Sequence, residues 1–123
     1  MLYRVLIYCR NPKKMAEFYV RHFHFETMPD EDERIIELRP TTGGAILMLH
    51  QAAKSQGTGQ STVKLVFDVA DVEAFIAKAT EQGLKFGKLH KADGYEFANA
   101  KDLDGNSISV SSRAFRARHS RDE

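Results

Sequence analysis

The chain has 123 residues, of which 42% are hydrophobic and 28% are charged, and this composition excludes a wholly disordered or fibrous protein. That length predicts one domain, and the formal net charge of +1 gives no overall attraction to nucleic acid or acidic lipid. No apolar run approaches the ~18 residues of a membrane helix, and the single cysteine, Cys9, cannot form an internal disulfide. We therefore expect a soluble, cytoplasmic protein with no membrane partner.

The first half of the chain has the pattern of a strand, a helix and three further strands. Apolar and more polar residues alternate from Arg4 to Cys9, as in a strand with two different faces. Asn11 and Pro12 then supply the N-cap and first residue of a helix with one apolar stripe. The later strands are expected at about 25–28, 34–39 and 45–50, with the acidic run Asp30–Glu33 in a solvated turn.

The second half repeats this order. Residues 64–69 alternate as residues 4–9 do, Asp71 supplies the N-cap of a second helix, and Gly83 lies where a left-handed residue can end it. Asp104-Gly105-Asn106 predicts a tight turn. The strands of this copy are expected at about 86–91, 95–101 and 107–112, after a small, polar connector at 52–62.

This repeat predicts an α+β fold with a single domain over residues 1–113. Module one covers about 2–51 and module two about 63–113, and each is a βαβββ unit. Two such units can curl their mixed sheets into a shared cup and keep their helices outside. Residues 114–123 form a basic tail that we expect to be flexible rather than to bind nucleic acid.

The alternation along each strand decides which residues line the cup. The more apolar face should pack on the helices, which makes Cys9 a buried and unreactive thiol. The opposite face is mixed polar and apolar, as is typical of small-molecule sites. Its candidate ligand-binding residues are Arg4, Leu6, Tyr8, Met48, His50, Lys64, Val66, Asp68, Ser109 and Ser111.

The paired plan and the segments RVLIYCRNPKKMAEFYVRHFHF and YEFANAKDLDGNSISV resemble the vicinal oxygen chelate superfamily. That superfamily includes glyoxalase I, bleomycin-resistance proteins, fosfomycin-resistance transferases and extradiol dioxygenases. The resemblance covers about Tyr3 to Arg113, and its most specific part is LDGNSISV, with Leu103 where proline is commoner. It implies the cup fold, a homodimer and, in the family's enzymes, one divalent metal. The metal-ligand positions fall on Arg4, Lys64, Ser109 and, within one residue, Met48.

These four residues are unsuited to a metal. Zn²⁺, Ni²⁺ and Fe²⁺ need neutral imidazole or carboxylate ligands, whereas arginine only donates hydrogen bonds and protonated lysine has no lone pair. We therefore expect no metal, no other cofactor and no metal-dependent activity of the glyoxalase type. A different metal site would need unpaired ligands such as Glu37, His50, His90 or His24, and the pair His22 and His24 straddles a helix end.

Arg4 and Lys64 instead predict a cup that binds a small organic ligand through its acidic group, with hydrogen bonds from Ser109 and Ser111. The alternative is that Asp68, Glu37 or Glu96 already neutralises the two cations. Two other functions stay open. One is a glyoxalase-like lyase, isomerase or dioxygenase with an unrecognised metal site, and the other is a structural or regulatory protein with a filled cup. Exposed sheet edges also favour a homodimer.

Overall fold

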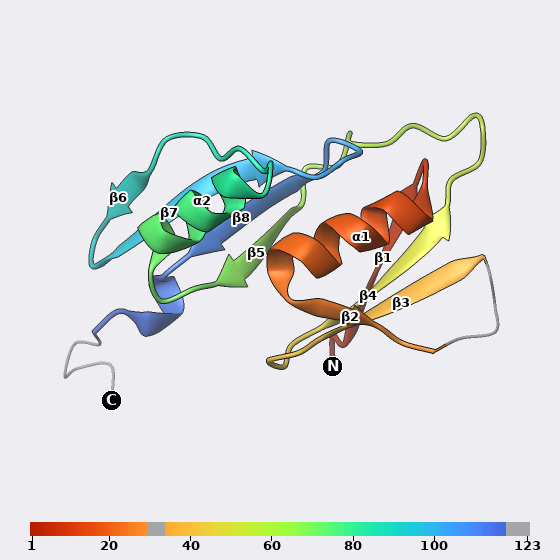
Figure 1. Ribbon diagram of the computed structural model, residues 1–123. Coiled ribbons are helices and arrows are strands. Elements are labelled where there is room, and N and C mark those ends of the chain that lie inside the picture. The colour runs from red at the N-terminus through yellow and green to blue at the C-terminus, as the bar shows by residue number, and fades with distance from the viewer. Residues whose placement is uncertain (30–33, 118–123) are drawn as a thin grey trace. The chain divides into compact units, whose positions relative to one another are not determined.

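In the computed structural model, which describes residues 1–29 and 34–117, the chain divides into two compact units. The first comprises Met1–Ser61 with Asp102–Asn106, and the second comprises Thr62–Lys101 with the chain from Ser107 onward. Each unit has a helix and a four-stranded sheet (Figure 1). The predicted α+β fold of two βαβββ modules is therefore confirmed. The expected acidic turn at 30–33 and the tail beyond residue 117 lie outside the described residues.

In the first unit, helix α1 (Pro12–Phe23) packs on a sheet with the strand order β1-β4-β3-β2. β1 is parallel to β4, and the other pairs are antiparallel. As predicted, Asn11 caps the helix, because its side-chain oxygen accepts a hydrogen bond of 3.1 Å from the Lys14 amide. The strands are β1 (Arg4–Cys9), β2 (Phe25–Thr27), β3 (Ile35–Pro40) and β4 (Ile46–Gln51).

The second unit repeats this topology with helix α2 (Val72–Glu81) and the strand order β5-β8-β7-β6. Asp71 accepts a hydrogen bond of 3.0 Å from the Ala74 amide, and Gly83 adopts a φ of 95° beyond the helix end, so both predicted end signals are confirmed. Neither helix of the described part of the chain is long and apolar enough to cross a membrane. The strands are β5 (Lys64–Asp68), β6 (His90–Ala92), β7 (Tyr95–Lys101) and β8 (Ser107–Ser111), followed by the short 3₁₀ turn η1 (Arg113–Phe115).

The strand predicted at about 86–91 is present as β6, but the prediction is wrong over residues 86–89, because β6 begins only at His90. The segment before it packs against the helix instead: the Phe86 ring meets the ring of Phe75 on α2 edge to face, with 6.1 Å between centroids. The amide of Gly87 still donates a hydrogen bond of 2.8 Å to the carbonyl of Asn99. β6 pairs with β7 only beyond the residues that contact α2.

The core of each unit lies between its helix and its sheet, on the strand face that the alternation predicts. Cys9, Leu38 and Leu49 are fully buried in the first unit, as are Ile108 and Val110 in the second. Burial, reinforced by the nearby carboxylates of residues 104 and 102, raises the pKa of Cys9 to about 12. The prediction of an unreactive thiol on the helix side of the sheet agrees with this environment.

The turn between β7 and β8 belongs to the first unit, where it surrounds a buried carboxylate. Asp102 is 6% exposed, and its Oδ2 accepts hydrogen bonds from the Tyr19 hydroxyl at 2.7 Å and the Asn106 side-chain amide at 2.9 Å. Its Oδ1 accepts the backbone amides of Asp104 at 3.0 Å and Asn106 at 2.9 Å. Burial and the Asp102 charge raise the pKa of Tyr19. The carboxylate therefore has four donors, and one of them comes from α1.

Candidate functional site

The candidate site consists of the sheet faces that point away from the helices. In the first unit this face carries Leu6 and Tyr8, which are 40% and 45% exposed, together with Met48 and His50 on the neighbouring strand. The rings of Tyr8 and His50 meet edge to face with 5.4 Å between centroids. The predicted residues of this unit therefore lie together and form an apolar, solvent-accessible surface.

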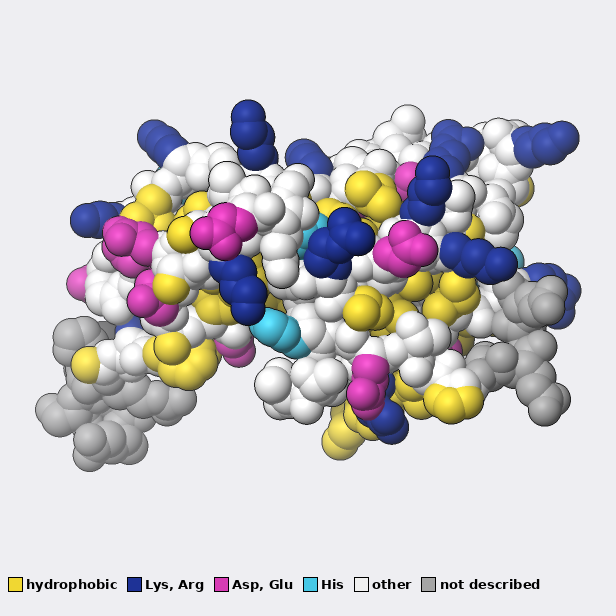
Figure 2. Space-filling model, viewed as in Figure 1, with side chains coloured by type: hydrophobic (Ala, Val, Ile, Leu, Met, Phe, Trp, Pro, Cys, Tyr) yellow, Lys and Arg dark blue, Asp and Glu magenta, His cyan; other side chains and the backbone are white. Residues whose placement is uncertain are grey.

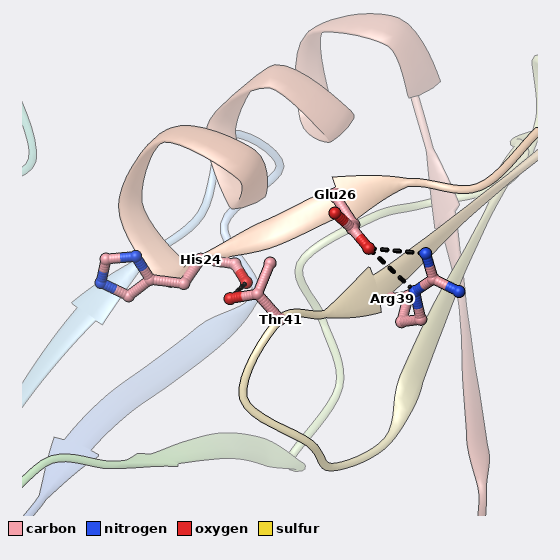
Figure 3. Close-up of polar contacts among 4 residues, drawn as sticks. All are labelled: His24, Glu26, Arg39 and Thr41. Carbon is pink, nitrogen blue, oxygen red and sulfur yellow. Dashed lines mark hydrogen bonds and ion pairs between the residues drawn. The ribbon is translucent and has the colours of Figure 1, made fainter.

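The cation of this face, Arg4, is already paired. It lies at the start of β1 and reaches across β4 to β3, where its Nε donates a hydrogen bond of 3.1 Å to Glu37 Oε1. Arg39 on β3 is paired in the same way with Glu26 on β2, through two hydrogen bonds of 3.0 and 2.6 Å to one carboxylate oxygen (Figure 3). The alternative that Glu37 neutralises Arg4 is therefore confirmed.

On the second unit, Lys64 reaches across the sheet in the same manner but meets a neutral partner. Its Nζ donates a hydrogen bond of 2.8 Å to Asn99 Oδ1, from β5 over β8 to β7. Asp68 lies four residues further along β5, about 13 Å away at the rise of a strand, and Glu96 alternates with Phe97, so its side chain lies on the other face. In the described part of the chain, neither carboxylate pairs with Lys64, so these two alternatives are wrong.

The two serines of the predicted site lie on β8, where Ser109 is opposite Asn99 and Ser111 is opposite Asp68 and Phe97. Ser109 is 3% exposed and Ser111 is 6% exposed. The Ser109 hydroxyl donates to the Val110 carbonyl at 3.4 Å, and the Ser111 hydroxyl accepts from the Arg113 amide at 3.1 Å. Both hydroxyls are therefore less accessible than the sequence led us to expect.

Sequence reasoning missed the residues that β7 adds to this face. Besides Asn99, β7 contributes Lys101, whose Nζ donates a hydrogen bond of 2.9 Å to the Ser107 hydroxyl. It also contributes Phe97, whose ring stacks on His90 with 4.8 Å between centroids and 15° between planes. The same alternation rule, applied along 95–101, would have placed all three on the face shared with Lys64.

A divalent metal does not fit the residues at the positions that the family resemblance implies. Arg4 and Lys64 both place cationic groups there and donate hydrogen bonds to acceptors of their own sheets. Ser109 and Met48 offer only weak ligands for Zn²⁺ or Fe²⁺. Across residues 1–29 and 34–117, no group of three or more His, Cys, Asp or Glu side chains is placed to hold a metal ion.

Comparison with known proteins gives a family and several structural neighbours. The family model described as Glyoxalase/Bleomycin resistance protein/Dioxygenase superfamily matches residues 2–110. TnmS3, an antibiotic binding protein from Streptomyces sp. CB03234, is 21% identical with a TM-score of 0.76 over 89% of this chain and 93% of that chain. TioX from Micromonospora sp. ML1 is 21% identical with a TM-score of 0.71 over 90% of this chain and 97% of that chain. Lactoylglutathione lyase from Agrobacterium tumefaciens is 16% identical with a TM-score of 0.70 over 90% of this chain and 92% of that chain. Comparison with curated proteins gave no match.

Proposed function

Because the chain belongs to the glyoxalase/bleomycin resistance protein/dioxygenase superfamily, we propose that it binds a small organic molecule through an acidic group and without a metal. The observation that carries the proposal is the partner of Lys64. Its ammonium is held by the neutral amide of Asn99, so its charge is available to an anion, whereas Arg4 already faces Glu37. A carboxylate attracts the ammonium by its full negative charge as well as by a hydrogen bond, whereas the amide oxygen carries only a partial charge, so an acid competes well with the amide.

Apolar side chains next to Lys64 give the rest of the ligand a surface to contact. Val66, 56% exposed, follows Lys64 on the same face of β5, and Phe97 lies on the same face of β7. On the first unit, Leu6, Tyr8 and Met48 are the corresponding candidates. The description of TnmS3 as an antibiotic binding protein supports a binding role for a protein of this fold. His50, Asp68, Ser109 and Ser111 stay candidates at the margins of these surfaces.

A thermal-shift screen with aromatic and aliphatic carboxylates, each compared with its neutral amide, tests this proposal. We expect stabilisation by acids and not by their amides, because a ligand at 100 times its Kd adds about 2.7 kcal/mol to the stability. Lys64→Gln should abolish the shift. Arg4→Gln is the matched control and should keep most of it, because Arg4 is already paired with Glu37. Equal shifts by acids and amides, or an undiminished shift in Lys64→Gln, would contradict the proposal.

Metal independence has its own test. Elemental analysis of freshly purified protein should find no stoichiometric metal, and titration with Zn²⁺, Ni²⁺, Mn²⁺ and Fe²⁺ should show no tight site. The physical reason is that neither Arg4 nor Lys64 has a lone pair to offer a metal ion. About one tightly bound ion per chain would contradict this part of the proposal and favour an enzyme of the glyoxalase type.

We also propose a cytoplasmic homodimer. β1 and β5 are end strands of their sheets, and end strands offer unpaired backbone groups to a second chain. Light scattering should give twice the 13.9 kDa of one chain, and a mass of one chain would contradict the dimer.

A further inference from the structure

We propose that Lys64 and Lys101 together bind a doubly charged anionic group, so that the acid of the ligand is a compact dianion such as a phosphate monoester. This inference rests on the proposed function, which places an acid at Lys64. It adds a second binding residue, on another strand, and it specifies the charge of the group that is bound.

Both lysines lie directly opposite the same serine. Ser107 on β8 is the register partner of Lys64 on β5 and of Lys101 on β7, so the three side chains form one row across the sheet and share a face. Neighbouring strands are 4.7–4.9 Å apart, which puts the two lysine Cα atoms about 10 Å from each other. Two long, exposed side chains at that spacing can both reach one small anion above Ser107.

Both ammonium groups have only neutral partners in the described part of the chain. Lys64 donates to Asn99 at 2.8 Å, and Lys101 donates to Ser107 at 2.9 Å. The carboxylate on this face, Asp68, is two rows further along, about 13 Å from Lys64 at the rise of a strand. Two like charges close together repel each other, and a bound dianion would relieve this repulsion and match both charges.

In the first unit, the cations at the two equivalent positions are both neutralised by carboxylates of the same sheet. Arg4 and Arg39 occupy the rows equivalent to Lys64 and Lys101, because Arg39 follows Glu37 by two residues on β3 as Lys101 follows Asn99 on β7. Arg4 has Glu37 as its carboxylate partner, and Arg39 has Glu26 (Figure 3). The uncompensated charge is therefore particular to the second unit.

The charge of the chain as a whole is close to zero. On the face shown in Figure 2, Lys and Arg side chains are interspersed with Asp and Glu, in agreement with the formal net charge of +1. An attraction to dianions is therefore expected from the row of two lysines and not from the field of the whole protein.

Two probes of similar shape and different charge test the inference. Phenyl phosphate has a second pKa near 6, so it carries about two negative charges at pH 7.5, whereas benzenesulfonate carries one. We would titrate each into ¹⁵N-labelled protein and follow the backbone amide of Ser107 by NMR. We expect phenyl phosphate to bind about three- to tenfold more tightly than benzenesulfonate.

Variants then separate the two lysines. Lys101→Gln should lower the preference for phenyl phosphate to about twofold or less and leave benzenesulfonate binding nearly unchanged, whereas Lys64→Gln should weaken both probes. Lys101→Arg should keep the preference because it keeps the charge. The matched control is Arg39→Gln, at the equivalent position of the first unit, which should change neither affinity.

Each outcome has a distinct meaning. Equal binding of the two probes by the unaltered protein, or an undiminished preference in Lys101→Gln, would overturn the inference and leave the proposed function standing. Loss of the preference in Arg39→Gln would also overturn it, because total charge would then be responsible. If neither probe binds, both the inference and the proposed acid site fail.

Discussion

Replacing Asp102 by asparagine tests how much the β7–β8 turn contributes to the stability of the chain. Each oxygen of the buried carboxylate accepts two hydrogen bonds, Oδ2 from Tyr19 and the Asn106 side chain, and Oδ1 from two backbone amides. Asparagine keeps the size but has only one oxygen. Whichever way its amide is oriented, two of the four donors will face an NH₂ group and lose their acceptor.

The expected loss follows from these contacts. A hydrogen bond to a charged group contributes about 1.5–3 kcal/mol, so the loss of two predicts that Asp102→Asn lowers the free energy of unfolding by about 3–6 kcal/mol. Tyr19→Phe removes one donor and should cost about 1.5–3 kcal/mol. For a chain of this size each kcal/mol lowers Tm by about 3–6 °C, so Asp102→Asn should lower Tm by about 10–35 °C.

Urea unfolding followed by far-UV circular dichroism measures these free energies. Tyr3→Phe is a matched control, because the Tyr3 side chain is exposed and its hydroxyl removal should change stability by less than about 0.5 kcal/mol. The double variant of Tyr19→Phe and Asp102→Asn should lose less than the sum of the two single losses, since the two side chains share a hydrogen bond. A loss below about 0.5 kcal/mol for Asp102→Asn would refute the reasoning.

Three further predictions concern other buried or strained positions. Gly59→Ala should destabilise the chain by about 2 kcal/mol more than Gly43→Ala in urea, because both glycines have positive φ but a Cβ on Gly59 alone would overlap the Asp104 carbonyl oxygen; equal losses would contradict this. Burial, with the charge of a neighbouring arginine, lowers the pKa of His22, so the unfolded chain binds more protons and stability should fall as the pH drops below about 6.5. His22→Leu should flatten that dependence in unfolding measured at pH 5 and 7.5, and an unchanged slope would argue against it. Cys9, with its pKa raised by burial to about 12, should react with a thiol reagent at pH 8 only in denaturing urea, and rapid labelling of the native protein would be inconsistent with its burial.

Most of the fold could be predicted because its signals are local. Asn11 and Asp71 cap their helices through amides three residues ahead, so each helix start is encoded in a few residues. The alternation of apolar and polar residues likewise placed Cys9 on the buried face of its strand and Leu6 on the exposed face. The position of β6 could not be found this way, because it depends on the contact of Phe86 with α2. Alternation cannot distinguish a side chain that packs on a helix from one in a strand.

Only part of the candidate site could be predicted from the sequence, because the residues that β3 and β7 contribute are far in sequence from those on β1 and β5. Alternation placed Arg4 and Lys64 on the correct faces, but their acceptors are 33 and 35 residues away in sequence. Which residue lies across two strands depends on the register of three strands, and the intervening turns set that register. The sequence therefore showed the cations without showing that one has a carboxylate partner, Glu37, and the other an amide, Asn99.

The position of the β7–β8 turn in the first unit also has a consequence for biosynthesis. Tyr19 and Asp102 are separated by 83 residues, and ribosomes add about 5–20 residues per second. The Tyr19 hydroxyl is thus made roughly 4–17 s before its acceptor exists. During translation the first unit therefore stays incomplete until Asp102–Asn106 are made, and by then residues 62–101 of the second unit have already been synthesised.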